Sequence, residues 1–474
     1  MAVQTALVVG AIVAIGSKRL PLGIPGEWEW LRVKIAPTFA SLSIGAAAVA
    51  AYSGFVALGY RSLSRPGQSA RGREWAWVLG LAVASVGIQA AVQEAAPVGH
   101  GLSKWAFALR DPGANGYYTV AKTSINDCSK FLADYPTWIR KQGSLHIGTH
   151  PPGLFVVSYA AVRWMEGNPA LASWVGRHSP ESVEQAFRAL AETFPLSRPD
   201  RSALTLIGAL TLLCCALTVV PLYALARTRF DPANAWVSAT LWPLVPAAVM
   251  FQPAADTAFP LVVVSALLLS AWSSRVWGWS IGAGLVLALG MQFTLAFLPV
   301  GLIVALSIAF DRPNSVRLRL IRFLATGFGF VGGTLICWIL MRANPFSIWW
   351  ANQVNHAGFY LAYPKSYRRW VLETPVEVAI ALGLPTAFWF LAGLRKAPRE
   401  TWATALILAI LLFSGRSLSE VARLWIPYFP MLLLAAGTGF QRFQAKGIDL
   451  FVTVCLLGAQ TLALQGIIQV VYPT

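Results

Sequence analysis

The chain alternates long apolar segments with short polar ones along almost its whole length. A membrane-spanning helix needs about 20 predominantly apolar residues, and segments of this kind recur from one end of the sequence to the other. The candidate spans are residues 1–17, 38–60, 75–95, 203–226, 232–250, 257–274, 276–291, 292–310, 321–341, 374–394, 401–415, 423–440 and 448–470. Because three of them are short, the pattern predicts about 13 transmembrane helices, within a range of about 12 to 14.

The composition also indicates a membrane protein. Hydrophobic residues make up 56% of the 474 residues and charged residues only 12%, and the mean hydropathy is +0.59. A soluble protein carries roughly 25% charged residues, so residues 1–474 are predicted to form a single all-α polytopic transmembrane domain. The net charge of +17 is expected to face anionic membrane lipids and not nucleic acid.

Basic residues orient the predicted spans, because arginine and lysine concentrate in cytoplasmic loops. Four clusters separate pairs of candidate spans, and each is expected to be cytoplasmic. They contain Arg61, Arg65, Arg71 and Arg73; Arg227 and Arg229; Arg312, Arg317, Arg319 and Arg322; and Arg395, Lys396 and Arg399. The third span must then run outwards and the fourth inwards, which puts residues 96–202 in one large loop on the outer side.

This predicted outer loop, residues 96–202, is long for a connection without a function. It carries two amphipathic stretches, Tyr117–Tyr135 and Pro180–Phe194. Its apolar run, residues 153–165, is too short to cross a membrane without tilting and is interpreted as a juxtamembrane helix. The alternative is that residues 151–165 do cross the membrane and that another short span is assigned wrongly.

Two of the five histidines in the chain lie close together in the loop. His146 and His150 are followed by Pro151-Pro152-Gly153, and the prolines would hold both imidazoles on a rigid segment at a helix entrance. The i, i+4 spacing would suit a metal pair on a helix, but Gly148 and the prolines argue against a continuous helix. Contact with a polar substrate or a phosphate is therefore preferred, and a purely structural anchor stays open.

Carboxylates form a second group of candidates. Asp111 lies in Arg110-Asp111-Pro112-Gly113 and is either a general base or a turn residue. Asp256 precedes a predicted span, either as its N-cap or as a site residue. Glu420 and Arg423 are i, i+3 neighbours at the mouth of another span, where they pair with each other or bind substrate.

A third group combines polar, aromatic and basic residues that are expected on the same outer side. His356 follows Asn352 and Asn355, and Tyr363, Tyr367, Arg368 and Arg369 come after it in the chain. Arg416 belongs to the segment with Glu420 and Arg423. Cations of this kind suit a phosphate, and aromatic faces suit a sugar ring. The alternative for the arginines is that their side chains reach the lipid headgroups.

In their order, these motifs resemble the GT-C superfamily of integral membrane glycosyltransferases. The chain is most similar to glycosyltransferase family 39, the protein O-mannosyltransferase and aminoarabinose-transferase type. Asp111 before the loop, His150-Pro151-Pro152-Gly153 at its end and Asp256 on a later span follow the pattern of that family. Residues 420–425 resemble a Gly-Glu-x-x-Arg-x-Trp pattern of bacterial members, and the similarity extends over roughly residues 75–440.

The sequence departs from the family pattern at two points. The family usually has two adjacent carboxylates in its acidic motif, whereas Asp111 is followed by Pro112. Asp127 and Asp134 therefore stay open as alternative bases. More than one span also precedes the acidic loop, where one is usual.

The resemblance implies inverting transfer of a sugar from a polyprenyl-phosphate carrier to a lipid, glycan or protein on the outer face of a bacterial inner membrane. Asp111 would be the general base. The predicted substrate-binding residues are His146, His150, Asp256, His356, Arg369, Arg416, Glu420 and Arg423, the arginines stabilising the departing phosphate. No cofactor is implied to be required, and a divalent metal is compatible with the reaction.

Two other classes of protein stay open. A transporter or lipid flippase would show charges inside its spans and interrupted helices in repeated halves, whereas mid-span charges are nearly absent here and no repeat is visible. A non-catalytic assembly or sensor protein would bind a partner through the outer loop. An enzyme would gather Asp111, His150 and Glu420 or Arg423 around one outer cavity, and a transporter would gather them along a path through the midplane.

Overall fold

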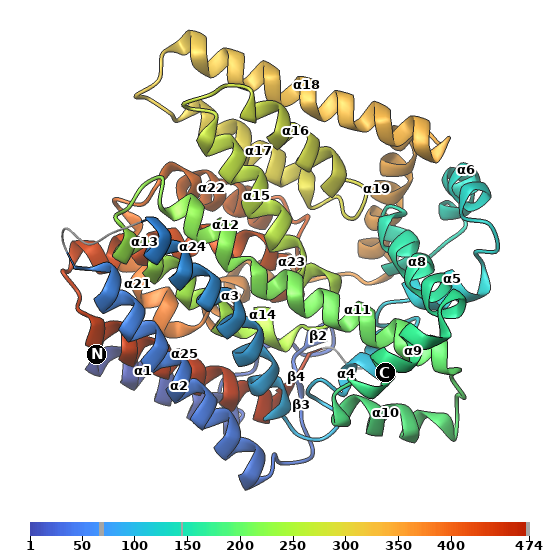
Figure 1. Cartoon of the computed structure of the whole chain (residues 1–474), viewed down its shortest axis with the longest axis horizontal. Coiled ribbons are helices and arrows are strands. Elements are labelled where there is room, and N and C mark those ends of the chain that lie inside the picture. Colours follow the sequence, from blue (N-terminus) through green and yellow to red (C-terminus); the bar gives the residue numbers. More distant parts are fainter. Residues whose placement is uncertain (66–70, 144–145, 471–474) are drawn as a thin grey trace.

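The protein is built almost entirely from α-helices (Figure 1). The computed structural model describes residues 1–65, 71–143 and 146–470, and in these ranges only four two-residue strands accompany the helices. The all-α prediction is therefore confirmed.

The N-terminal part of the chain consists of three helices and a short strand-containing segment, residues 23–32, which is called the strap below. It contains α1 (Ala2–Gly16), β1 (Gly23–Ile24), β2 (Trp28–Glu29), β3 (Leu31–Arg32), α2 (Phe39–Leu63) and α3 (Arg71–Glu94). Strands β1 and β2 pair antiparallel, and β3 pairs antiparallel with β4 (Ile468–Gln469). The strap therefore joins the segment after α1 to the segment that follows the last helix, α25 (Gly447–Ile467).

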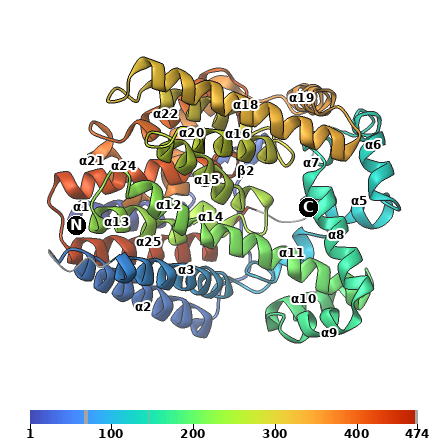
Figure 2. The same cartoon turned by 45° about the horizontal axis from the view of Figure 1, so that its top comes forward.

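Seven shorter helices fill the segment between α3 and α11 (Arg198–Leu217). They are α4 (Lys104–Ala108), α5 (Tyr117–Thr123), α6 (Cys128–Ile139), α7 (His146–Thr149), α8 (Gly153–Gly167), α9 (Pro169–Arg177) and α10 (Glu181–Ala191). They gather at one end of the molecule, with α8 and α9 against α11 (Figure 2). The expected juxtamembrane helix is α8, and its position relative to the membrane stays a prediction.

The second half of the chain continues the bundle. It contains α12 (Val219–Ala226), α13 (Pro232–Leu241), η1 (Trp242–Leu244), α14 (Pro246–Met250), η2 (Ala255–Thr257), α15 (Phe259–Trp272), α16 (Trp279–Gly290), α17 (Phe297–Ala309), α18 (Val316–Met341), α19 (Pro345–Ala362), α20 (Tyr367–Leu382), α21 (Leu384–Leu394), α22 (Arg399–Phe413), α23 (Val421–Leu424), η3 (Ile426–Tyr428) and α24 (Phe429–Arg442). The elements labelled η are single turns of 3₁₀ helix.

Seven helical stretches of the described chain are long and apolar enough to cross a membrane. They are Phe39–Leu63, Arg71–Glu94, Arg198–Ala226, Ala255–Trp272, Val316–Met341, Val421–Arg442 and Gly447–Ile467. An eighth results if α20 and α21, which are bent by 108°, form one span. The protein is thus a polytopic membrane protein, but the prediction of about 13 spans and of a single outer loop is not confirmed.

Burial distinguishes central from peripheral helices. In the stretch Val421–Arg442, 89% of the most apolar window is buried inside the protein, against 22% in α18. Helix α18 exposes Leu324, Phe328 and Ile339 and runs along the edge of the bundle (Figure 1). Large exposed apolar side chains are what a helix surrounded by lipid requires.

Several of the arginines that orient the predicted spans are held in ion pairs. Arg227 Nε lies 2.6 Å from Glu74 Oε1, and Arg229 Nη2 lies 2.5 Å from Glu400 Oε1. Arg322, which is fully buried, contacts Asp311 and donates to Ser273 Oγ at 2.7 Å. These pairs therefore connect separate helices, a role that charge counting along the sequence does not predict.

Candidate functional site

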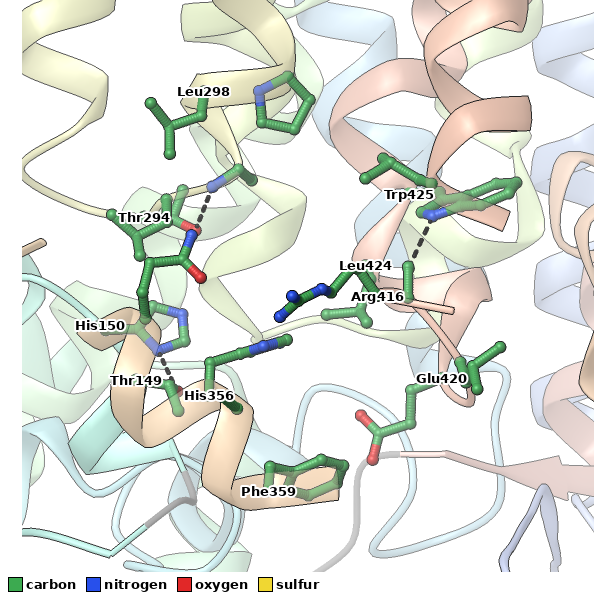
Figure 3. A pocket seen from close by; sticks show the side chains of 18 of the residues that line it. Thr149, His150, Thr294, Leu298, His356, Phe359, Arg416, Glu420, Leu424 and Trp425 are labelled. Atoms are coloured by element: carbon green, nitrogen blue, oxygen red, sulfur yellow. Dashed lines mark hydrogen bonds between the residues drawn. The ribbon is translucent and has the colours of Figure 1, made fainter. Parts of the chain in front are cut away.

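A cavity of about 740 Å³ lies where several helix ends meet (Figure 3). Its walls come from the α7–α8 connection, η2, the start of α17, one face of α19, the end of α22 and residues 416–428. Six of the nine predicted site residues line it: His150, Asp256, His356, Arg416, Glu420 and Arg423. The structure thus brings together side chains that are far apart in the sequence.

The predicted catalytic residue does not line this cavity. Asp111 Oδ2 accepts a hydrogen bond from the Ala114 amide at 2.9 Å, and the Asp111 carbonyl accepts hydrogen bonds from the amides of Asn115 and Gly116. These are the contacts of a turn residue. Arg369 is exposed on α20 and does not line the cavity either.

The alternative bases also lie elsewhere. Asp127 caps α6, because its Oδ1 accepts hydrogen bonds from the amides of Ser129 and Lys130. Asp134 is exposed on the same helix, and neither residue lines the cavity. The side chain of His146 lies outside the described part of the structure, so its predicted role in substrate binding is not tested by the structure.

The main chain around His150 is fixed by side chains from two helices. Tyr135 Oη donates to the His150 carbonyl at 2.7 Å, and Asn352 Nδ2 donates to the carbonyls of Gly148 and His150 at 3.1 Å each. Asn355 Nδ2 adds a hydrogen bond to the Gly148 carbonyl at 2.9 Å. The backbone of this loop is therefore an anchor point, while the His150 side chain lines the cavity.

The polar cluster on α19 divides by what its side chains contact. Asn352 and Asn355 donate to the His150 loop through the hydrogen bonds just described, whereas His356 and Tyr360 line the cavity. Asn352 and His356 are four positions apart and therefore neighbours on the helix, so the two pairs lie side by side on α19. The sequence indicated a polar site here. It did not indicate that α19 both supports the His150 loop and forms part of the cavity wall.

Asp256 follows a broken, deeply buried segment. Prolines at positions 243, 246 and 253 interrupt the helix, because proline lacks an amide donor, and α14 ends at Met250. Lys104 Nζ donates to the Met250 carbonyl at 2.7 Å, and Gln252 is hydrogen-bonded to Gln89 and Gln93 of α3. Neighbouring helices thus supply the partners that the interrupted backbone and its side chains need.

The N-cap interpretation of Asp256 is wrong. Helix α15 begins at Phe259, and its N-terminus has no side-chain cap. Asp256 Oδ2 instead lies 3.6 Å from Arg423 Nε. The carboxylate is directed at the cavity and not at the helix amides.

Arg423 lies between two carboxylates. Its Nη2 contacts Glu420 Oε2 at 2.7 Å, and its Nε approaches Asp256 as described. Ser419 and Glu420 have φ angles of 63° and 50°, a left-handed conformation that costs roughly 1–3 kcal/mol for a non-glycine residue and clusters at functional sites. The i, i+3 pairing of Glu420 with Arg423 was one of two interpretations of the sequence, and the participation of Asp256 was not foreseen.

A second basic group combines His356 of α19 with Arg416 of the segment that follows α22. Burial, together with the positive charge of Arg416, lowers the pKa of His356 from its usual value of 6.5. The described residues place no carboxylate within 4.0 Å of the Arg416 guanidinium, in contrast to Arg423. The cavity therefore contains one guanidinium that is available to an anion, next to an imidazole that is neutral at pH 7.

Tyr117 is a buried residue that supports the site from behind the cavity lining, and sequence reasoning missed it. It belongs to the same motif as Asp111, residues 110–118, and its ring packs edge-on against His150, with centroids 5.6 Å apart. Burial raises the pKa of Tyr117, and the charge of Asp256 raises it further. The motif therefore reaches the site through its tyrosine and not through its aspartate, and the aromatic pair that follows Gly116 was the available signal.

In the described ranges, no group of three or more His, Cys, Asp or Glu side chains is arranged to hold a metal ion. The two cavity carboxylates converge on the Arg423 guanidinium instead.

No protein-family model matches the chain, and a search of curated proteins found no match either. The class of protein therefore rests on the fold and the cavity. Together they define a polytopic helical membrane protein with a charged, partly apolar cavity at the ends of its helices.

Proposed function

We propose that the protein is a membrane glycosyltransferase, which moves a sugar from a polyprenyl-phosphate carrier to a hydroxyl group of a lipid, glycan or protein. One observation carries the proposal. A single cavity combines two carboxylates, an unpaired arginine, two histidines and an apolar lining, all at the ends of apolar helices. Ionisable groups that converge beside the apolar part of a membrane protein are usually functional.

The lining suits a donor with a polar head and a hydrocarbon tail. Leu298, Trp350 and Val354 line the cavity, yet their side chains are also 45%, 70% and 54% exposed on the protein surface. A tail that leaves the cavity along these residues would pass directly into lipid. Arg416 would take the phosphate, because a guanidinium matches the geometry of phosphate oxygens.

We assign the general base to Asp256 and not to Asp111. The Asp256 carboxylate would accept the proton of the acceptor hydroxyl while the hydroxyl oxygen attacks the anomeric carbon. The bond from that carbon to the phosphate oxygen breaks, its electron pair leaves with the phosphate, and Arg416 stabilises the new charge. A single displacement of this kind inverts the anomeric configuration, and Glu420 would keep Arg423 oriented beside the base.

The orientation supports a lipid-borne donor. Helix α17 begins at the cavity and ends before Arg312, and α22 begins at Arg399 and ends at the cavity. The arginine clusters are thus at the opposite helix ends, and basic ends are typically cytoplasmic. We infer that the cavity opens to the exterior, which in a bacterium is the periplasmic side of the inner membrane.

The test is transfer of radiolabelled sugar from polyprenyl-phosphate donors in membranes that contain equal amounts of each variant. We expect Asp256→Asn to lower transfer about a hundredfold or more, which is typical for loss of a general base. Asp111→Asn is the matched control and should transfer as the wild type does. Full transfer by the Asp256 variant would disprove its role, and loss in the Asp111 variant alone would return the base to Asp111.

A transporter or lipid flippase is the second candidate, because the bundle contains interrupted helices. The pair α20–α21 bends by 108° at Gly383, and the segment from α13 to η2 is broken as well. Interrupted helices line substrate paths in many transporters. The same membranes distinguish the two functions: a transporter would move a labelled lipid-linked sugar across the bilayer without forming a new glycosidic bond.

A further inference from the structure

The hydroxyl of Tyr360 joins the two walls of the cavity. It accepts a hydrogen bond from the Leu418 amide at 3.0 Å. Its own proton can be donated to the carbonyl of Arg416, at 3.2 Å, or of Leu418, at 3.4 Å. One side chain of α19 thus holds the backbone on either side of Ser417.

The segment that Tyr360 holds is conformationally demanding. Residues 415–420 lie in the connection between α22 and α23, and Gly415, Ser419 and Glu420 all have positive φ angles. This segment presents Arg416 and Glu420 to the cavity. A short, strained connection keeps one conformation only when contacts around it fix that conformation.

Tyr360 also contacts a neighbour on its own wall of the cavity. Its ring packs edge-on against His356, one turn earlier on α19, with centroids 5.6 Å apart. The same residue therefore touches the imidazole on one wall and the backbone that carries Arg416 on the other. Figure 3 shows His356, Arg416 and Glu420 around the same hollow.

We propose that Tyr360 is a positioning residue whose hydroxyl clamps residues 415–420 onto α19, so that Arg416 faces a bound anionic headgroup. The inference rests on the proposed function only in taking that headgroup to be a lipid phosphate. Tyr360 itself need not contact the reacting atoms. It acts indirectly, by fixing the position of the Arg416 guanidinium.

The test compares Tyr360→Phe, which removes only the hydroxyl, with Tyr363→Phe. Tyr363 is 46% exposed on the segment that follows α19 and does not line the cavity. Hydrogen exchange of the Leu418 amide should accelerate several-fold in Tyr360→Phe, because its acceptor is lost. Affinity for farnesyl phosphate, a short isoprenyl monophosphate, should fall roughly fivefold to tenfold, and the Tyr363 variant should match the wild type in both.

A double-mutant cycle separates positioning from a general loss of stability. Arg416→Gln should weaken farnesyl phosphate binding, and adding Tyr360→Phe should weaken it little further, because the hydroxyl acts through Arg416. Additive effects, or unchanged affinity in Tyr360→Phe despite faster Leu418 exchange, would overturn the positioning role. Unchanged Leu418 exchange would overturn the clamp itself. Absence of sugar transfer by a wild type that passes both tests would count against the proposed function alone.

Discussion

The charged groups of the cavity differ in how completely they are paired. Arg423 is compensated by Glu420 and Asp256, whereas Arg416 has no carboxylate within 4.0 Å in the described structure. Charge pairs inside a protein are stable only when their geometry offsets the cost of desolvation. Arg416 is exposed, so it is the guanidinium that an anionic ligand can reach without displacing a carboxylate.

His356 gives the cavity a predictable pH dependence. Its pKa is lowered by burial and by Arg416, so the native protein binds this proton less tightly than the unfolded chain does. The stability contributed by the neutral imidazole is present above the unfolded pKa of about 6.5 and is lost as the pH falls below it. We expect the wild type to lose thermal stability below this pH more steeply than His356→Gln.

Thermal unfolding of both proteins between pH 5 and pH 8, measured in the same detergent, checks this expectation. The control is His178→Gln, because His178 is exposed on the surface and does not line the cavity. That variant should keep the dependence of the wild type. Parallel profiles for the wild type and His356→Gln would show that His356 is not the group responsible.

At the scale of secondary structure, hydrophobic pattern predicted the long helices well. The predicted spans 38–60, 75–95 and 448–470 correspond to α2, α3 and α25 within a few residues. Each of these helices has an uninterrupted apolar run between its ends, so the local signal agrees with the final packing. The prediction failed where a span is interrupted.

Two interrupted spans show the physical reason. Residues 232–250 were expected as one span but form α13, a turn of 3₁₀ helix and α14, because Pro243 and Pro246 cannot donate backbone hydrogen bonds. Residues 374–394 were likewise expected to be continuous but bend at Gly383, whose φ is 90°. Average hydropathy does not register either event, since the flanking residues stay apolar.

Helix α19 was not predicted from the sequence. Its asparagines support the site through hydrogen bonds, and this support can be tested. Asn352 is fully buried and donates to the carbonyls of Gly148 and His150. Asn352→Ala leaves these carbonyls short of a donor, so we expect a loss of about 1–3 kcal/mol in the free energy of unfolding. Sugar transfer should fall with it, because the His150 loop loses its support.

Hydrogen exchange of residues 147–150 and thermal unfolding measure the two effects. Leu361→Ala is the matched control on the same helix, since Leu361 is 86% exposed. It should leave both measurements unchanged. An Asn352 variant with wild-type exchange in the loop would mean that Tyr135 and Asn355 are sufficient to fix it.

At the scale of the whole molecule, the sequence indicated which residues are chemically interesting but not which of them meet. His150, Asp256 and Glu420 were all candidates, and the fold brings them to one cavity. Asp111 was ranked above Asp256 because of its place in a family pattern, and the fold puts it in a turn. Contacts between residues so distant in sequence depend on helix packing, which no local pattern records.

The bundle also predicts that the two ends of α25 face opposite sides of the membrane. Met1 lies at a small cavity with Lys446 and Asp449, at the start of α25, whereas β4, which follows α25, pairs with β3. A helix of 21 residues is about 30 Å long, close to the thickness of the hydrocarbon layer. Lys34, just after β3, and Lys446 should therefore be accessible from opposite sides, with Lys34 outside together with the cavity.

Labelling of intact cells with a membrane-impermeant maleimide tests this arrangement in Lys34→Cys and Lys446→Cys. Both lysines are exposed, so neither change should disturb folding, and the unsubstituted protein reports labelling of the five native cysteines. We expect Lys34→Cys to react directly and Lys446→Cys to react only after permeabilisation. The reverse pattern would turn the cavity towards the cytoplasm, where nucleotide-activated donors are available, and would remove the main reason for proposing a lipid-linked one.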